Sequence, residues 1–209
     1  PYKLPRTLEI RVAECDGEAD AWYGDDEITI CYEYIEELWN HIPEQTTPGG
    51  VEPWDAVAGP FVDTSLHEFA HALFDMLDIP VLGRIEDAAD QVAAYIYLQL
   101  GPEESRRLIG GTVYAFLYEA ENKPALTLAD YADEHGTPAQ RAFNVLCIAY
   151  GADTKVFSQI IREGYLPPER AEFCEEEYEQ VKDAYEELIG PYVDQALAAE
   201  IFERSWMLQ

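Results

Sequence analysis

The run FVDTSLHEFAHALFDML (residues 61–77) contains an HExxH pentapeptide, from His67 to His71, inside an apolar helical pattern. At 3.6 residues per turn, His67 and His71 project from one face of a helix, one turn apart. Two imidazoles in this arrangement can share one zinc ion. Glu68 lies at the edge of the same face, where it can reach a metal-activated water without coordinating the metal. The pentapeptide therefore predicts a Zn2+ site at which Glu68 acts as the general base.

A catalytic zinc site needs a third protein ligand and an open fourth position. The longer pattern HExxHxxGxxH is absent, because Phe74 stands where the glycine would be and Leu77 where the last histidine would be. Glu86 follows His71 by fifteen residues, beyond a turn over 78–83. Six residues can span about 20 Å when extended, which is enough to bring Glu86 back beside His71. We expect Glu86 to be the third ligand.

Two further carboxylates follow the expected third ligand in sequence. Asp90 lies one helical turn after Glu86 and on the same face, and we expect it to accept the free ring N–H of a ligand histidine and so fix its tautomer. Asp87 is the alternative ligand. Glu86 and Asp90 are also compatible with an ordinary helix N-terminus, where negative charge is favoured by the helix dipole.

The remaining pattern predicts an α+β fold in a single domain, residues 1–209, with an N-terminal α/β lobe of about 1–77 and a helical lobe of about 78–209. Alternation and β-branched residues predict short strands, and helical periodicity dominates after a long loop rich in Pro and Gly. The expected strands cover 8–13, 19–23 and 27–30, the first helix covers 31–40, and the loop covers 41–60. The later helices are expected at about 62–77, 84–100, 103–121, 137–150, 153–163, 168–188 and 191–207.

The charge balance excludes several classes of partner. The chain has 42 Asp and Glu against 13 Lys and Arg, for a formal net charge of −29. That field repels phosphate backbones and anionic lipid, so nucleic acid and membrane surfaces are not expected as partners. No apolar run approaches the roughly 20 residues of a membrane-spanning helix.

Four cysteines lie far apart, and no CxxC motif is present to suggest a cysteine zinc site. Pairing between neighbours in sequence would join Cys15 to Cys31 and Cys147 to Cys174. Disulfides would indicate an exported protein, periplasmic or secreted, whereas four buried free thiols would suit the cytosol. Because the sequence starts at Pro1 without a charged-then-apolar leader, we expect a mature form from which a signal peptide has been removed.

The HExxH motif followed by ExxxD resembles the gluzincin pattern of zinc metallopeptidases. Segments spread over most of the chain also resemble a bacterial family that is catalogued as a domain of unknown function and described as metallopeptidases. These segments are 19–23, 28–33, the HExxH run, 81–91, 133–135, 140–141, 144–151 and 166–174. The resemblance implies a zincin-like fold, a zinc ion bound by His67, His71 and Glu86, and Glu68 as the base.

A peptidase also has to stabilise the oxyanion of the tetrahedral intermediate. The candidates are His135, Arg141, Tyr165 and Tyr95, and we place His135 first as a catalytic residue because it lies in a polar stretch typical of a loop. Arg141 could instead pair with one of the abundant acids. The segment 19–23 is either an edge strand that binds an extended peptide or an ordinary sheet edge.

The sequence thus predicts a zinc-dependent metallopeptidase that acts on peptides or proteins. The alternative is a non-catalytic zincin-like domain that binds a partner and holds a structural zinc. A purely structural site would need no base beside its histidines, and Glu68 therefore favours the peptidase. A zinc hydrolase acting on another amide or on an ester is the third hypothesis, because fold alone does not decide the substrate.

Overall fold

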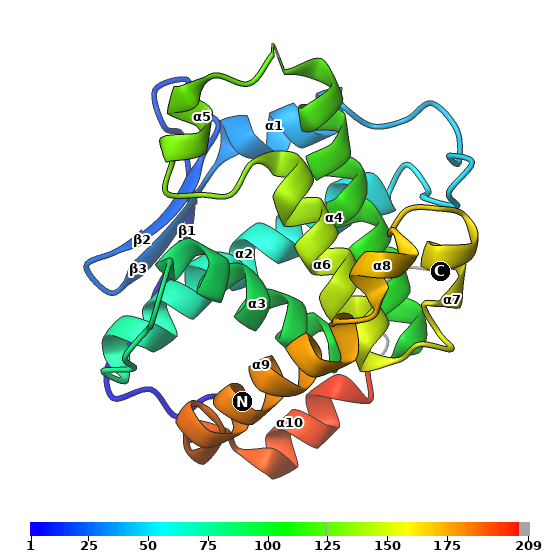
Figure 1. The fold of residues 1–209 in the computed structure, drawn as a ribbon. Helices are drawn as coiled ribbons and strands as arrows, with labels where there is room; N and C mark the ends of the chain where they lie inside the picture. Colours follow the sequence, from blue (N-terminus) through cyan, green and yellow to red (C-terminus); the bar gives the residue numbers. More distant parts are fainter. Residues whose placement is uncertain (124, 205–209) are drawn as a thin grey trace.

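A computed structural model describes residues 1–123 and 125–204, and it shows a small sheet followed by a mostly helical part (Figure 1). The predicted α+β class is therefore confirmed. The strands are β1 (Glu9–Ala13), β2 (Ala21–Gly24) and β3 (Glu27–Cys31). The helices are α1 (Tyr32–Asn40), α2 (Asp55–Met76), α3 (Ile85–Leu98), α4 (Pro102–Asn122), α5 (Leu128–Ala132), α6 (Pro138–Ala152), α7 (Ser158–Arg162), α8 (Pro168–Ala171), α9 (Cys174–Leu188), the 3-10 helix η1 (Gly190–Tyr192) and α10 (Gln195–Phe202).

The sheet has the strand order β1-β3-β2, with β1 parallel and β2 antiparallel to β3. The central strand β3 is buried, whereas β1 exposes Ile10 and Val12 at the outer edge. The other edge, β2, packs against α2. There the Tyr23 hydroxyl donates a hydrogen bond to Asp75 near the end of α2 (2.8 Å). An edge strand therefore runs beside the helix that carries the HExxH motif.

Helix α2 is the centre of the fold and packs against both α3 and α4. It begins at Asp55, so the loop predicted for 41–60 is too long, and Pro60 lies inside the helix. The helix extends through Gly59 and Pro60 because α2 crosses α4 at close range there. A Cβ at Gly59 would lie 2.5 Å from the Leu108 carbonyl oxygen, and a Cβ at Gly111 would collide with the Asp55 carbonyl. Only glycines let the two backbones approach so closely, and the packing gained offsets the hydrogen bond that Pro60 cannot donate.

The C-terminal helices are shorter than predicted. The helix expected over 153–163 is reduced to α7, and the one expected over 168–188 is divided into α8 and α9. The break brings the start of α9 against α6, where a Cβ at Gly151 would collide with the Cys174 carbonyl. Of the helix expected over 191–207, the structure shows η1 and α10, and 205–207 lie outside the described residues.

Helix α5 was not predicted from the sequence. Its start is capped by the Asp130 carboxylate, which accepts hydrogen bonds from the Thr127 backbone N–H and hydroxyl, both at 2.7 Å. A Thr followed three residues later by an acid is a local capping signal that could have indicated this helix.

The structure contains two disulfides, each between cysteines that are neighbours in sequence. Cys15–Cys31 ties the segment after β1 to the end of β3, and Cys147–Cys174 ties α6 to the start of α9. Cys31, Cys147 and Cys174 are all fully buried. Among the described residues, no helix combines the length and the apolar character that a membrane crossing requires.

Removing the Cys147–Cys174 disulfide should lower the free energy of unfolding by about 3–4 kcal/mol, because the bridge closes a 27-residue separation and restricts the unfolded chain. Urea unfolding of the Cys147→Ala/Cys174→Ala variant under non-reducing conditions measures the change. Reduction of the remaining Cys15–Cys31 bridge in the same variant should lower the free energy of unfolding by about 3 kcal/mol more. Equal stability of the wild type and the double variant would contradict the prediction.

Candidate metal centre

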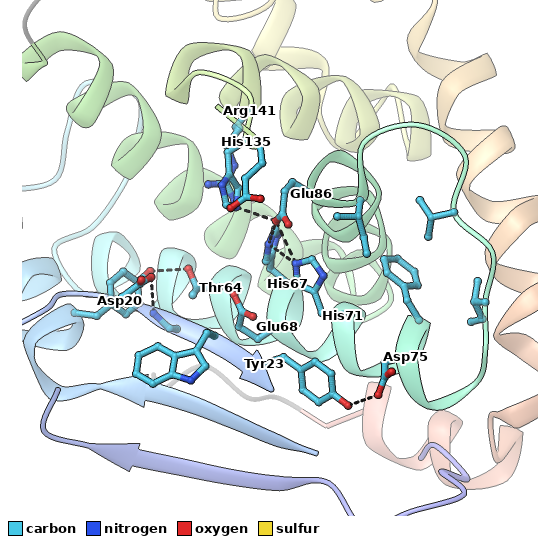
Figure 2. A pocket seen from close by; sticks show the side chains of 18 of the residues that line it. Asp20, Tyr23, Thr64, His67, Glu68, His71, Asp75, Glu86, His135 and Arg141 are labelled. Atoms are coloured by element: carbon cyan, nitrogen blue, oxygen red, sulfur yellow. Dashed lines mark hydrogen bonds and ion pairs between the residues drawn. The ribbon is translucent and has the colours of Figure 1, made fainter. Parts of the chain in front are cut away.

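The two histidines of the HExxH motif converge with a carboxylate from the next helix (Figure 2). His67 Nε2 lies 3.1 Å from His71 Nε2, and the two nitrogens lie 2.9 and 3.1 Å from Glu86 Oε2. The first two residues come from successive turns of α2, and Glu86 comes from the first turn of α3. The chain between the helices therefore turns back as the sequence required.

This triangle of donor atoms fits a tetrahedral metal ion. Ligand atoms at about 2.0–2.1 Å from zinc in a tetrahedral site are about 3.3 Å apart, close to the 2.9–3.1 Å found here. Two imidazoles and one carboxylate are also a donor set that zinc accepts in catalytic sites. Asp87, the alternative ligand, instead lines a separate pocket with Arg84 and Gly136.

Asp90 lies behind the first histidine, as expected from its position one turn after Glu86. His67 Nδ1 donates a hydrogen bond to Asp90 Oδ1 (2.7 Å), which leaves Nε2 directed at the donor triangle. The same carboxylate accepts two hydrogen bonds from the Arg141 guanidinium, at 2.7 and 2.8 Å. Arg141 comes from α6 and also lies over the Phe116 ring, 4.5 Å from its centroid. Arg141 therefore pairs with an acid, the interpretation that competed with an oxyanion role.

The charges around His67 are those of a cation site. Burial lowers the pKa of His67, but the hydrogen bonds with Asp90 and Glu86 outweigh burial and raise the pKa to about 9. The hydrogen bond with His67 lowers the pKa of Glu86 to about 2. Burial opposes ionisation of Asp90, yet its bonds with His67 and Arg141 bring the pKa of this carboxyl to about 2. Two ionised carboxylates thus face one imidazole, where a metal would take the place of the proton.

Glu68 lines the same cleft without joining the donor triangle. It is buried, and burial raises the pKa of its carboxyl to about 7, although a hydrogen bond from the Tyr23 backbone lowers it. The sequence predicted Glu68 at the edge of the histidine face of α2. Its hydrogen bond from the Tyr23 backbone shows that this edge faces β2.

His135 reaches the centre from the loop before α6. Its Nε2 lies 2.9 Å from Glu86 Oε2, and its ring stacks on the His67 ring with a centroid separation of 5.7 Å. The Arg84 guanidinium holds this loop by donating hydrogen bonds to the backbone carbonyls of His135 (2.9 Å) and Asp133. Arg84 immediately precedes α3, so the loop is fastened to the helix that carries Glu86.

The other oxyanion candidates lie elsewhere. Tyr95 packs its ring against Tyr178 and Tyr185. The Tyr165 hydroxyl lies against Gly49, and Tyr165 lines a different pocket, on α4 and α7. Neither tyrosine is among the residues that line the cleft with the histidines.

The cleft around the donor triangle has a volume of about 960 Å³ and is open to solvent on one side. β2 forms one wall, α2 the floor, and the start of α3 with the loop before α6 the opposite wall (Figure 2). A second group, Cys15, Cys31 and Glu33, also brings possible ligand atoms together. Its sulfurs are joined in a disulfide and Glu33 accepts backbone hydrogen bonds from Cys15 and Gly17, so it offers no thiolate to a metal.

Residues 1–189 match the sequence model of a family described as "Putative metallopeptidase". The match covers most of the chain, and the chain belongs to this family. The resemblance of the sequence to a metallopeptidase family is thereby confirmed. No curated protein and no solved structure is significantly similar to the chain. The family description agrees with a metal site and with a hydrolase that acts on peptides.

Replacing Glu86 should remove most of the metal affinity, because a donor atom of the triangle is lost. We expect Glu86→Ala to reduce zinc content to a small fraction of one ion per chain. Asp87→Ala is the matched control: it removes the next carboxylate in sequence, which lines another pocket, and should leave zinc content unchanged. Elemental analysis after gel filtration measures both variants. Loss of zinc in Asp87→Ala with retention in Glu86→Ala would reverse the ligand assignment.

Replacing Asp90 should weaken metal binding without removing a ligand atom. Asp90→Ala leaves His67 free to rotate and to change tautomer, and losses of this kind cost about 10- to 100-fold in metal affinity. Competition with a fluorescent zinc chelator gives the dissociation constants of variant and wild type. An unchanged constant would mean that Asp90 serves only the packing of α3 against α6.

Proposed function

We propose that this member of the family is a zinc-dependent peptidase, with the metal held by His67, His71 and Glu86 and with Glu68 as the general base. The observation that carries the proposal is the triangle of donor atoms, whose edges measure 2.9–3.1 Å. Two histidines and one glutamate supply three ligands and leave the fourth position for water or substrate, which is the arrangement of a catalytic rather than a structural zinc site.

Each residue at the centre has a distinct task. A bound zinc ion would polarise the scissile carbonyl and lower the pKa of a water molecule. Glu68 takes a proton from the attacking water and passes it to the leaving amine, since it lines the cleft beside the donor triangle. Asp90 holds the His67 ring so that Nε2 faces the centre. Arg141 keeps Asp90 ionised and in place.

We assign stabilisation of the oxyanion to His135. Its imidazole lies at the rim of the donor triangle, half-exposed to the cleft, and can donate a hydrogen bond to charge that develops on the carbonyl oxygen. The clamp from Arg84 fixes the loop backbone on both sides of Glu134, which limits how far the imidazole can move.

An extracellular or periplasmic site of action is also proposed. Two disulfides form and persist in oxidising compartments. A net charge of −29 keeps such a protein soluble and directs it away from nucleic acid and anionic lipid. Peptides or unfolded proteins are the substrates that suit an open cleft beside an edge strand.

The Glu68→Gln variant tests the mechanism. Glutamine fills nearly the same volume and still bonds to water but cannot take its proton, so hydrolysis of a peptide mixture should fall about 10²- to 10⁴-fold. Zinc content and thermal unfolding should match the wild type. Glu36→Gln, an exposed carboxylate on α1, is the control for charge and should keep full activity. Cleavage by Glu68→Gln at the wild-type rate would refute the mechanism. A zinc-loaded wild type that cleaves no peptide would favour the partner-binding alternative.

A further inference from the structure

We infer that the cleft selects peptides with a large aliphatic or aromatic side chain next to the scissile bond, which packs against a wall formed by Phe74, Ile79, Val81 and Ile85. All four residues line the cleft that contains the donor triangle. The inference rests on the proposed peptidase function and adds the class of substrate side chain. We call these four residues the apolar wall.

The apolar wall begins at the metal ligands themselves. Phe74 follows His71 by three residues on α2, and the two rings have a centroid separation of 6.4 Å in an edge-to-face arrangement. Ile85 immediately precedes Glu86 at the start of α3 and is 45% exposed. A side chain held against this wall is therefore attached to a backbone that runs past the donor triangle.

The wall is held rigidly because it continues the hydrophobic core. Phe74 is only 7% exposed and belongs to a buried cluster with Leu73, Ala89 and Val92, against which Ile79 and Val81 pack. The chain reverses directly after α2 at Asp78, whose φ is +53°, and the Ile79 N–H then bonds to the Phe74 carbonyl (2.9 Å). A surface that is fixed before binding loses little conformational freedom when it is covered, and this favours a complementary apolar side chain.

The rest of the cleft lining is mixed. It includes Ala21, Trp22 and Tyr23 of β2 together with the polar residues Asp20, Thr64 and Glu134. The two carboxylates are exposed and would repel an acidic substrate, as would the net charge of −29. An acidic side chain placed against the apolar wall would therefore lose its hydration without gaining a partner.

The experiment compares two matched peptides, identical except for leucine or glutamate beside the cleaved bond, with zinc-loaded protein. Hydrophobic pockets discriminate about 10- to 200-fold for a single methylene, so we expect kcat/KM for the leucine peptide to be at least about 10-fold higher. Val81→Lys should reduce or reverse this ratio, because it places a cation in the wall. Leu82→Lys is the matched control: Leu82 is 100% exposed, does not line the cleft, and should leave the ratio unchanged.

A binding measurement separates failure of this inference from failure of the proposed function. Peptide hydroxamates with leucine or glutamate at the same position chelate zinc whether or not hydrolysis occurs, and calorimetry gives their dissociation constants.

Hydrolysis without a leucine preference, or equal shifts from Val81→Lys and Leu82→Lys, would overturn the inference and leave the peptidase standing. Tighter binding of the leucine hydroxamate by a protein that cleaves nothing would support the wall and refute the peptidase. Equal binding of the two hydroxamates, or no binding of either, would overturn the inference. Zinc content and thermal unfolding of each variant show that the fold is kept.

Discussion

The hydrogen bond from His67 to Asp90 is the interaction on which the centre depends. It fixes the tautomer of His67, so that Nε2 rather than Nδ1 faces the donor triangle. Asp90 is only 8% exposed, and a buried carboxylate is costly unless it is paired. Arg141 supplies the pairing charge with two hydrogen bonds. One chain of charge-assisted contacts therefore joins α2, α3 and α6, and the same contacts that hold the helices together orient the ligand.

The sequence predicted those parts of the site that depend on local geometry. Helical spacing alone placed the histidines on one face and put Asp90 one turn beyond Glu86, and a short turn limited where α3 could begin. The pairing of Arg141 with Asp90 joins residues 51 apart and depends on how α6 packs on α3, which no local pattern records. The start of α2 was missed for the same reason. Gly59 and Pro60 are loop signals locally, but the crossing with Gly111 buries them inside a helix.

The excess of acids makes the few cations structurally decisive. With 13 Lys and Arg against 42 Asp and Glu, few cations are available to pair with buried acids. Arg107 pairs with Asp55, which is 2% exposed, at the start of α2. Arg84 fastens the loop that carries His135. The remaining negative charge favours accumulation of cations near the protein.

The segment between α2 and α3, residues 77–84, connects the donor triangle to the apolar wall. Its reversal at Asp78 returns the chain so that Glu86 meets the histidines, and the same reversal places Ile79 and Val81 in the apolar wall. A change in the length of this segment would therefore displace Glu86 and the apolar wall together. Exchange of a side chain in the apolar wall, with the length of the segment unchanged, would leave the backbone at Glu86 and at the wall in place. Because a metal site tolerates only small shifts of its ligands, exchange of wall side chains is the change that would alter the apolar wall and leave the donor triangle in place.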